Sequence, residues 1–126
     1  MTTHDLDADT LKTTVSQEGV VLIDWWASWC GPCRAFAPIY SKVALQHPEV
    51  TFAKVDTQAH PELGALFGIR SIPTLMVFRD GILLYNQPGM LPERALKDII
   101  AQAQKLDMEA VRAEIAEADT KAKRAS

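Results

Sequence analysis

The order of apolar and polar segments along the chain predicts strands alternating with helices. Apolar residues fill nearly every position of "VVLIDWW" (20–26), as in a strand that is covered on both faces. A helix is expected to follow from about Cys30 to His47. Pro38 lies inside that helix, where its missing N–H should kink the axis.

The same alternation continues on both sides of this pair. A short edge strand near Thr3–Leu6 and a helix to Gln17, capped by Asp7 or Asp9, are expected in front of it. Behind it we expect, in order, a strand at 50–56, a short helix at 60–68, a strand at 74–78, a strand at 82–86, a loop "QPGML" and a helix opened by Pro92. The Asp-Gly pair in "RDG" (79–81) predicts a hairpin turn. This order predicts an α/β fold, with a central mixed β-sheet flanked by helices on both faces.

The last twenty residues differ from the rest. We predict an α/β domain at residues 1–106 and a C-terminal helical extension or tail at 107–126. Asp107 is suited to cap the extra helix. A narrow apolar stripe on this helix is made by Met108, Val111 and Ile115. Whether the extension docks on the domain, dimerises or binds a partner stays open.

Composition narrows the classes of function. The 126 residues are 48% hydrophobic, which suits one packed domain. A formal net charge of -3 argues against a nucleic-acid-binding face, and the apolar runs are too short to cross a membrane. The N-terminus is polar and acidic, unlike a secretory signal, so we expect a cytoplasmic protein.

The only two cysteines, Cys30 and Cys33, stand three positions apart around Gly31 and Pro32. Cys30 is expected at the first turn of a helix, where unpaired N–H groups and the helix dipole favour a thiolate. Cys33 lies one turn deeper on the same face, within reach for a disulfide. The pair therefore combines an attacking sulfur with a less exposed resolving sulfur.

Two plainer interpretations of the pair are weaker. A structural disulfide is uncommon in a reducing cytosol, and this chain can build a core without one. A metal site needs about four ligands, and the three histidines are not grouped at ligand spacing. We therefore predict no metal site and expect a working redox pair.

Beyond the cysteine spacing, the sequence resembles the thioredoxin family over roughly residues 6–104. The match consists of "VVLIDWWASWCGPCRAFAPIY", "FAKVD", "FGIRSIPTLMVFRDG" and "PG" at 88–89, in that order. The details of "CRAFAPI" and "FGIRSIPT" are most similar to the second bacterial type of the family. That type usually carries an N-terminal zinc module, for which this chain has no cysteines. The resemblance implies a thioredoxin fold.

Asp24 and Lys54 are the next candidates for the site. Asp24 ends an apolar strand, where burial should raise its pKa. The resemblance implies that this carboxylate lies behind Cys33 and helps to take its proton. It also implies an electrostatic role for Lys54 beside Asp24, although a strand lysine is ordinarily a solvated side chain.

The resemblance further implies a substrate-binding surface around Cys30. The Ile72–Pro73 bond is expected to be cis, which brings the preceding backbone beside the cysteines. Ile72 would then offer its N–H and C=O to an extended substrate segment. A flat apolar patch is expected from Trp29, Ile72, Pro73, Gly89 and Met90.

The predicted function is protein-disulfide reduction by thiol–disulfide exchange, which ends in an intramolecular Cys30–Cys33 disulfide. The Gly31-Pro32 turn resembles that of reducing members of the family. The resemblance implies disulfide-containing protein substrates, recycling by an NADPH-dependent flavin enzyme (thioredoxin reductase), and no bound cofactor. We expect a monomer. A dedicated electron donor to one partner enzyme and a non-catalytic docking subunit are the alternatives.

Overall fold

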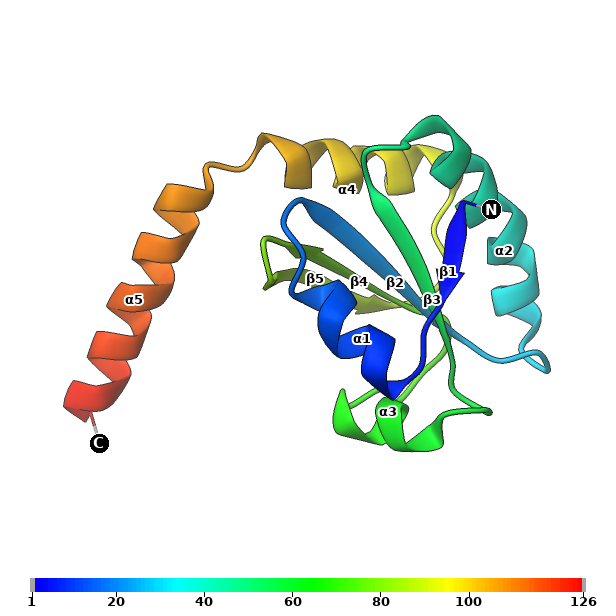
Figure 1. Ribbon diagram of the computed structural model, residues 1–126, viewed down its shortest axis with the longest axis horizontal. Coiled ribbons are helices and arrows are strands. Elements are labelled where there is room, and N and C mark those ends of the chain that lie inside the picture. Colours follow the sequence, from blue (N-terminus) through cyan, green and yellow to red (C-terminus); the bar gives the residue numbers. More distant parts are fainter. Residues whose placement is uncertain (1, 126) are drawn as a thin grey trace.

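The computed structural model describes residues 2–125, and within them the predicted α/β architecture is present (Figure 1). Five strands form one sheet in the order β1-β3-β2-β4-β5. The elements are β1 (Thr3–Asp5), α1 (Ala8–Val15), β2 (Val20–Trp26), α2 (Gly31–Gln46), β3 (Thr51–Asp56), α3 (Pro61–Leu66), β4 (Thr74–Arg79), β5 (Ile82–Pro88), α4 (Glu93–Lys105) and α5 (Met108–Ala125). β1, β3 and β2 are parallel, whereas β4 is antiparallel to both of its neighbours, β2 and β5, so the sheet is mixed as predicted.

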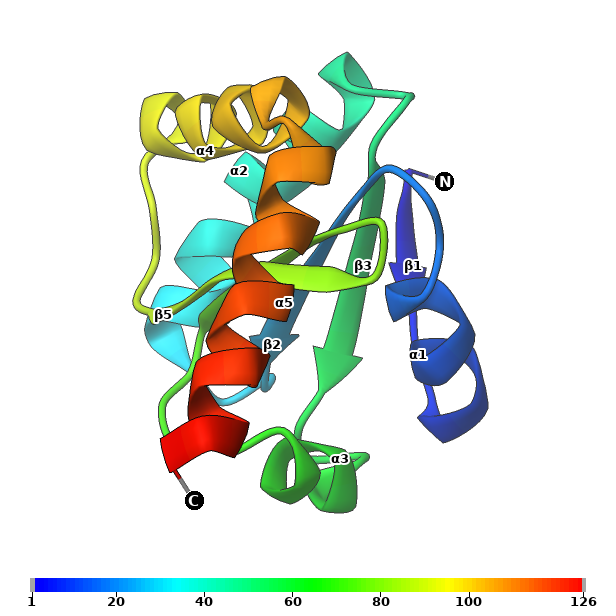
Figure 2. The same ribbon diagram turned by 90° about the vertical axis from the view of Figure 1, so that its left-hand side faces the viewer.

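Helices cover both faces of the sheet (Figures 1 and 2). Helices α2 and α4 pack on one face, and α1 and α3 pack on the other. The central strand β2 supplies both layers, with Val20 and Leu22 on the α2 side and Val21, Ile23 and Trp25 on the opposite side. Its nearly unbroken apolar run therefore follows from burial on both faces.

Local signals in the sequence explain several boundaries. Asp7 caps α1 in a capping box with Thr10, and Asp107 accepts the first free N–H groups of α5. At the β4–β5 turn, Asp80 and Gly81 have φ values of 53° and 80°, which the predicted Asp-Gly turn requires.

Three predicted C-terminal boundaries were wrong by two residues. β5 does not end at Asn86 but continues to Pro88, because Pro88 is the register partner of Thr74 on β4. A proline is tolerated there because β5 is an edge strand, whose outer N–H groups need no partner. Helix α1 ends at Val15 rather than at Gln17, and helix α3 ends at Leu66 rather than at Gly68.

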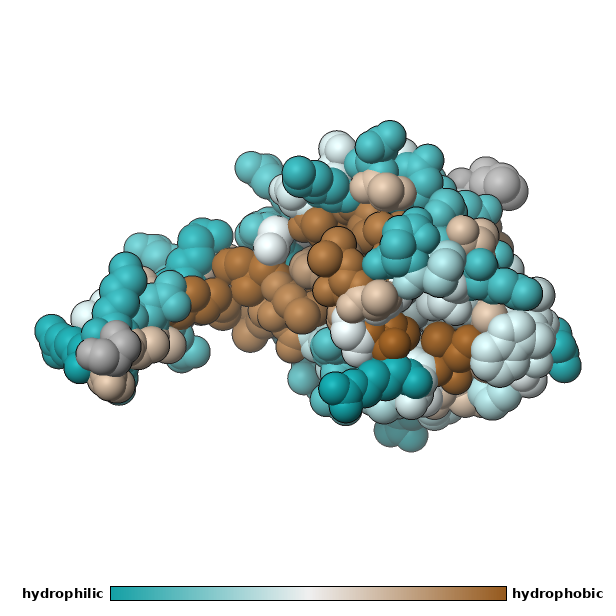
Figure 3. Space-filling view, turned by 90° about the horizontal axis from the view of Figure 1, so that it is seen from below, coloured by the Kyte–Doolittle hydropathy of each residue, from teal (hydrophilic) through white to brown (hydrophobic). Residues whose placement is uncertain are grey.

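Helix α5 leaves the body of the domain on the side of the β4–β5 hairpin (Figures 1 and 2). The Arg79 guanidinium donates to the carbonyls of Ala103, Gln104 and Leu106, at 2.8–3.0 Å, and so holds the end of α4 where α5 begins. Met108 is the only buried residue of 108–125. Figure 3 shows hydrophobic side chains where the helix leaves the body, and hydrophilic ones toward its far end.

Candidate active site

The two cysteines lie at the junction between β2 and α2. Cys30 is the N-cap of α2, and its sulfur accepts the N–H of Cys33 at 3.2 Å. The two residues form a disulfide, with 5.2 Å between their Cα atoms. Gly31 and Pro32 occupy the first two helical positions, where the missing N–H of proline breaks no helical hydrogen bond. The sequence thus places both sulfurs on the first turn of the helix, as predicted.

Both cysteines are shielded in this oxidised form. Cys30 is 4% exposed and Cys33 is 2% exposed, so the predicted difference in exposure is small. The Cys30 sulfur lies 3.6 Å from the carbonyl oxygen of Ile72, a contact rather than a hydrogen bond because a disulfide sulfur carries no hydrogen. The backbone of the 72–73 loop therefore lies directly beside the Cys30 sulfur.

The predicted docking patch (Trp29, Ile72, Pro73, Gly89 and Met90) includes residues of this loop. The Ile72–Pro73 bond is cis, as the resemblance implied, and the Gly89 N–H donates to the Pro73 carbonyl at 2.8 Å. Gly89 has φ 102°, a conformation that side chains other than that of glycine rarely adopt. Trp29 is 67% exposed, Met90 is 40% exposed, and Trp29 and Ile72 line the same shallow groove.

Asp24 is the buried charge of the site. The residue is 1% exposed, and neither carboxylate oxygen has a hydrogen-bond partner within residues 2–125. The pKa of Asp24 is raised from 3.8 to about 7, chiefly by burial. The positive charge of Lys54 acts against this rise. Lys54 is the register partner of Asp24 on the neighbouring strand β3. The predicted burial of Asp24 and its nearness to Lys54 are both confirmed.

Two further residues belong to this buried cluster and were not predicted. The Lys54 ammonium lies 4.8 Å from the ring centroid of Trp26. Tyr40 of α2 donates its hydroxyl to the Ala53 carbonyl at 2.8 Å. Burial raises the pKa of Tyr40, and the nearby charge of Asp24 raises it further. Trp26 stands two residues after Asp24, so strand periodicity already places both side chains on one face; Tyr40 gives no comparable signal.

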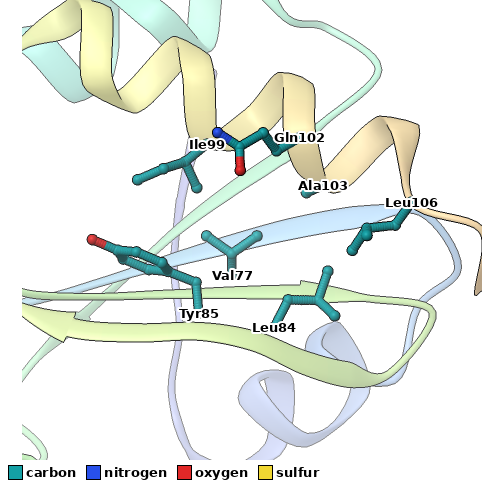
Figure 4. Close-up of a pocket in the computed structure, with 7 residues that line it drawn as sticks. All are labelled: Val77, Leu84, Tyr85, Ile99, Gln102, Ala103 and Leu106. Atoms are coloured by element: carbon teal, nitrogen blue, oxygen red, sulfur yellow. The ribbon is translucent and has the colours of Figure 1, made fainter. Parts of the chain in front are cut away.

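A separate apolar cavity of about 210 Å³ lies between α4 and β5 (Figure 4). Its lining is Val77, Leu84, Tyr85, Ile99, Gln102, Ala103 and Leu106. Only the Tyr85 hydroxyl and the Gln102 amide are polar, so the cavity offers no set of groups for acid–base or nucleophilic chemistry.

Within residues 2–125 no three acidic, histidine or cysteine side chains are grouped to hold a metal ion. No helix in that range is long and apolar enough to cross a membrane.

Comparison with known proteins identifies the arrangement. The thioredoxin family model matches residues 2–102. The chain belongs to the thioredoxin family. It is 51% identical over 120 residues to "Putative thioredoxin 2" of Streptomyces coelicolor, covering 95% of this chain and 90% of that protein. It is 41% identical over 93 residues to "Thioredoxin 1" of Synechococcus elongatus, covering 72% of this chain and 87% of that protein.

Solved thioredoxin structures have the same fold. A mutant thioredoxin from Halobacterium salinarum superposes with a TM-score of 0.76 at 34% identity, covering 82% of this chain and 92% of that one. The thioredoxin of Malassezia sympodialis superposes with a TM-score of 0.72 at 30% identity, covering 81% and 90%. The predicted thioredoxin fold is therefore confirmed.

Family membership establishes the chemistry. The protein is a thiol–disulfide oxidoreductase, and its Cys30–Cys33 dithiol reduces substrate disulfides. The family implies disulfide-containing substrates and a thioredoxin reductase as partners, and its members typically work without a cofactor. Nothing in the comparisons favours a dedicated donor or a non-catalytic docking subunit.

The burial of Asp24 predicts how stability depends on pH. The folded protein keeps this proton up to about pH 7, whereas the unfolded chain loses it near pH 3.8. Between these values the folded state binds more protons, so stability falls as the pH rises and the loss is complete above about pH 7. Asp24→Asn removes the buried charge and should stabilise the oxidised protein at pH 8 by up to about 4 kcal/mol, and hardly at pH 4.

Urea unfolding of the oxidised protein between pH 4 and pH 8 measures this difference. Asp119→Asn, on the exposed part of α5, is the matched control and should follow the parent at every pH. An Asp24→Asn advantage that is equally large at both ends of the pH range would contradict a raised pKa for Asp24.

Proposed function

We propose that this protein is a general protein-disulfide reductase that passes electrons from Cys30 and Cys33 to the disulfides of many proteins. The observation that carries the proposal is the position of Cys30, at the N-terminus of α2 and 3.6 Å from the Ile72 carbonyl. An extended substrate segment would pair with the backbone of Ile72 and lay its apolar side chains on the docking patch. Backbone pairing reads no particular side chain, which suits a broad range of substrates.

The first step would be attack by Cys30. In the reduced protein the Cys30 thiolate attacks one sulfur of the substrate disulfide, and a mixed disulfide forms. The substrate S–S bond breaks, and the other substrate sulfur leaves as a thiolate that takes up a proton. The N-terminal end of α2, with its unpaired N–H groups and positive dipole, favours the Cys30 thiolate.

The second step would be resolution by Cys33. Cys33 gives its proton to the Asp24 carboxylate, attacks the Cys30 sulfur, and releases the second substrate thiolate. The substrate has then gained two electrons, and the protein holds the Cys30–Cys33 disulfide. A pKa of about 7 suits Asp24 for this role, because the group can take and return a proton near neutral pH. Lys54 would assist by its positive charge.

The remaining assignments complete the proposed cycle. An NADPH-dependent flavin enzyme, a thioredoxin reductase, would reduce the Cys30–Cys33 disulfide again. The protein would act as a monomer in the cytoplasm and bind no cofactor of its own. The redox role of the two cysteines supports the cytoplasmic assignment, because a reducing compartment keeps such a dithiol in its active form.

Single substitutions of the cysteines test the two steps. Cys30→Ser should abolish turnover, measured as NADPH consumption with a bacterial thioredoxin reductase and insulin. Cys33→Ser should stop after the first step and accumulate a mixed disulfide, detected as a mass increase that a small dithiol removes. Normal turnover of Cys33→Ser would reject the two-cysteine mechanism. If the unaltered protein does not turn over although its disulfide is reducible by a dithiol, the result would point to a different electron donor or to a dedicated partner.

Asp24→Asn tests the proton acceptor. The variant should slow resolution of the mixed disulfide by about 100-fold at neutral pH, since it lacks the general base. The first attack should change far less. Stopped-flow tryptophan fluorescence, with the reduced protein mixed with a peptide disulfide, separates the two phases. Equal slowing of both phases would argue against the role of Asp24 in the second step.

We also propose that residues 1–106 are the functional domain and that 107–126 are an extension not needed for catalysis. A chain ending at Leu106 should retain turnover with insulin within about twofold of the full chain. It should lose about 2 kcal/mol of stability, because the burial of Met108 is lost. The NADPH assay and urea unfolding measure the two effects, with Ile115→Ala in the full chain as a control for the exposed part of α5. A large loss of turnover in the folded truncated chain would place α5 in substrate or reductase binding.

A further inference from the structure

Lys54 stands in a row of charged residues that crosses the sheet. Its register partners are Asp5 on β1 and Asp24 on β2, and register partners in adjacent strands point to the same face. Asp56, two residues further along β3, also lies on this face. Three carboxyl side chains therefore share with Lys54 the face of the sheet that α2 covers.

The ammonium group nevertheless contacts an aromatic ring. The Lys54 Nζ lies 4.8 Å from the ring centroid of Trp26, within the range of cation–π interactions. In the part of the chain that the structure describes, Lys54 forms no ion pair with any of the three carboxylates. Asp56 is engaged elsewhere, because it accepts the N–H groups of Gln58 and Ala59.

Trp26 is itself held in place. Its carbonyl accepts both the N–H and the hydroxyl of Thr57, at 2.8 and 3.0 Å, so the end of β2 is tied to the residue that follows β3. Trp26 and Asp24 are two residues apart on one strand and share a face. The neighbouring Trp25 points to the opposite face, where it packs against Phe67 at 5.3 Å.

We propose that Trp26 is a positioning residue, whose ring holds the Lys54 ammonium near Asp24 but out of an ion pair with it. This rests on the proton-acceptor role proposed above for Asp24. An ion pair would keep the carboxylate ionised, and a departed ammonium would leave it to burial alone. In the oxidised protein, the charged and titratable groups that bear on Asp24 are Lys54 of β3 and Tyr40 of α2, and beyond Lys54 the row continues to Asp5 of β1.

Loss of the Trp26 ring should change the pKa of Asp24 in a definite direction. Without Trp26 the ammonium moves to water, because stripping its hydration beside the buried Asp24 is unfavourable. Trp26→Leu should therefore raise the pKa of Asp24 by about one pH unit, because the carboxylate loses the attraction of a nearby positive charge. Trp26→Phe keeps a ring with a weaker attraction for cations and should raise it by less.

The measurement is a carbon-13 NMR titration of the Asp24 carboxyl group in the oxidised, full-length protein. Trp25→Phe is the matched control on the same strand and should leave the titration unchanged. Lys54→Met should raise the pKa by about as much as Trp26→Leu does. The double variant should rise no further than Lys54→Met alone, because Trp26 acts through Lys54. If Trp26→Leu fails to fold, the same cycle is run with Trp26→Phe.

Three outcomes would overturn the proposal: an unchanged titration in the Trp26 variants, a lowered pKa, or shifts that add in the double variant. The pH dependence of mixed-disulfide resolution in the same variants separates this proposal from the role of Asp24. If the Asp24 titration and the pH profile of the rate shift together, the positioning role of Trp26 and the proton-acceptor role of Asp24 are both supported. If the titration moves and the rate profile does not, Trp26 places the ammonium as proposed, and the proton-acceptor role of Asp24 fails.

Discussion

β2 is hydrogen-bonded on both of its edges, to parallel β3 on one side and antiparallel β4 on the other. This constraint gives the strand a fixed register, so that Asp24 lies opposite Lys54, six residues before Cys30 in the sequence. Helix α2 begins directly after the strand and carries Cys30 at its N-cap. The loop that leads into β4 closes the site from the other side through Ile72. The Cys30 sulfur, the buried carboxyl and the 72–73 loop are thus all arranged around one strand.

The buried carboxyl illustrates a conflict between stability and chemistry. Asp24 is almost fully buried, and neither of its oxygens has a partner in residues 2–125. Such a group destabilises the fold when it is charged, since desolvation opposes ionisation. The same desolvation moves its pKa to about 7, where a proton acceptor is useful. The strand tolerates the penalty because the two apolar layers around it supply the stability.

The sequence predicted the fold well where local rules apply. Asp7 and Asp107 cap their helices, and Asp80-Gly81 forms the expected turn, because each depends on residues only a few positions apart. The end of β5 was wrong because the cue, Pro88, marks a turn in most contexts. Its pairing with Thr74 depends on a partner strand that a local pattern does not contain.

The candidate site shows the same division. The cysteine spacing, the helix start and the apolar flanks of Asp24 are local features, and the sequence by itself determined from them a redox pair beside a buried carboxyl. Only the tertiary structure decided which groups surround that carboxyl. Lys54 over Trp26, and Tyr40 within the electrostatic reach of Asp24, join three elements that are distant along the chain. Such contacts depend on strand register and helix packing, which are set by the collective burial of the core rather than by any short stretch of residues.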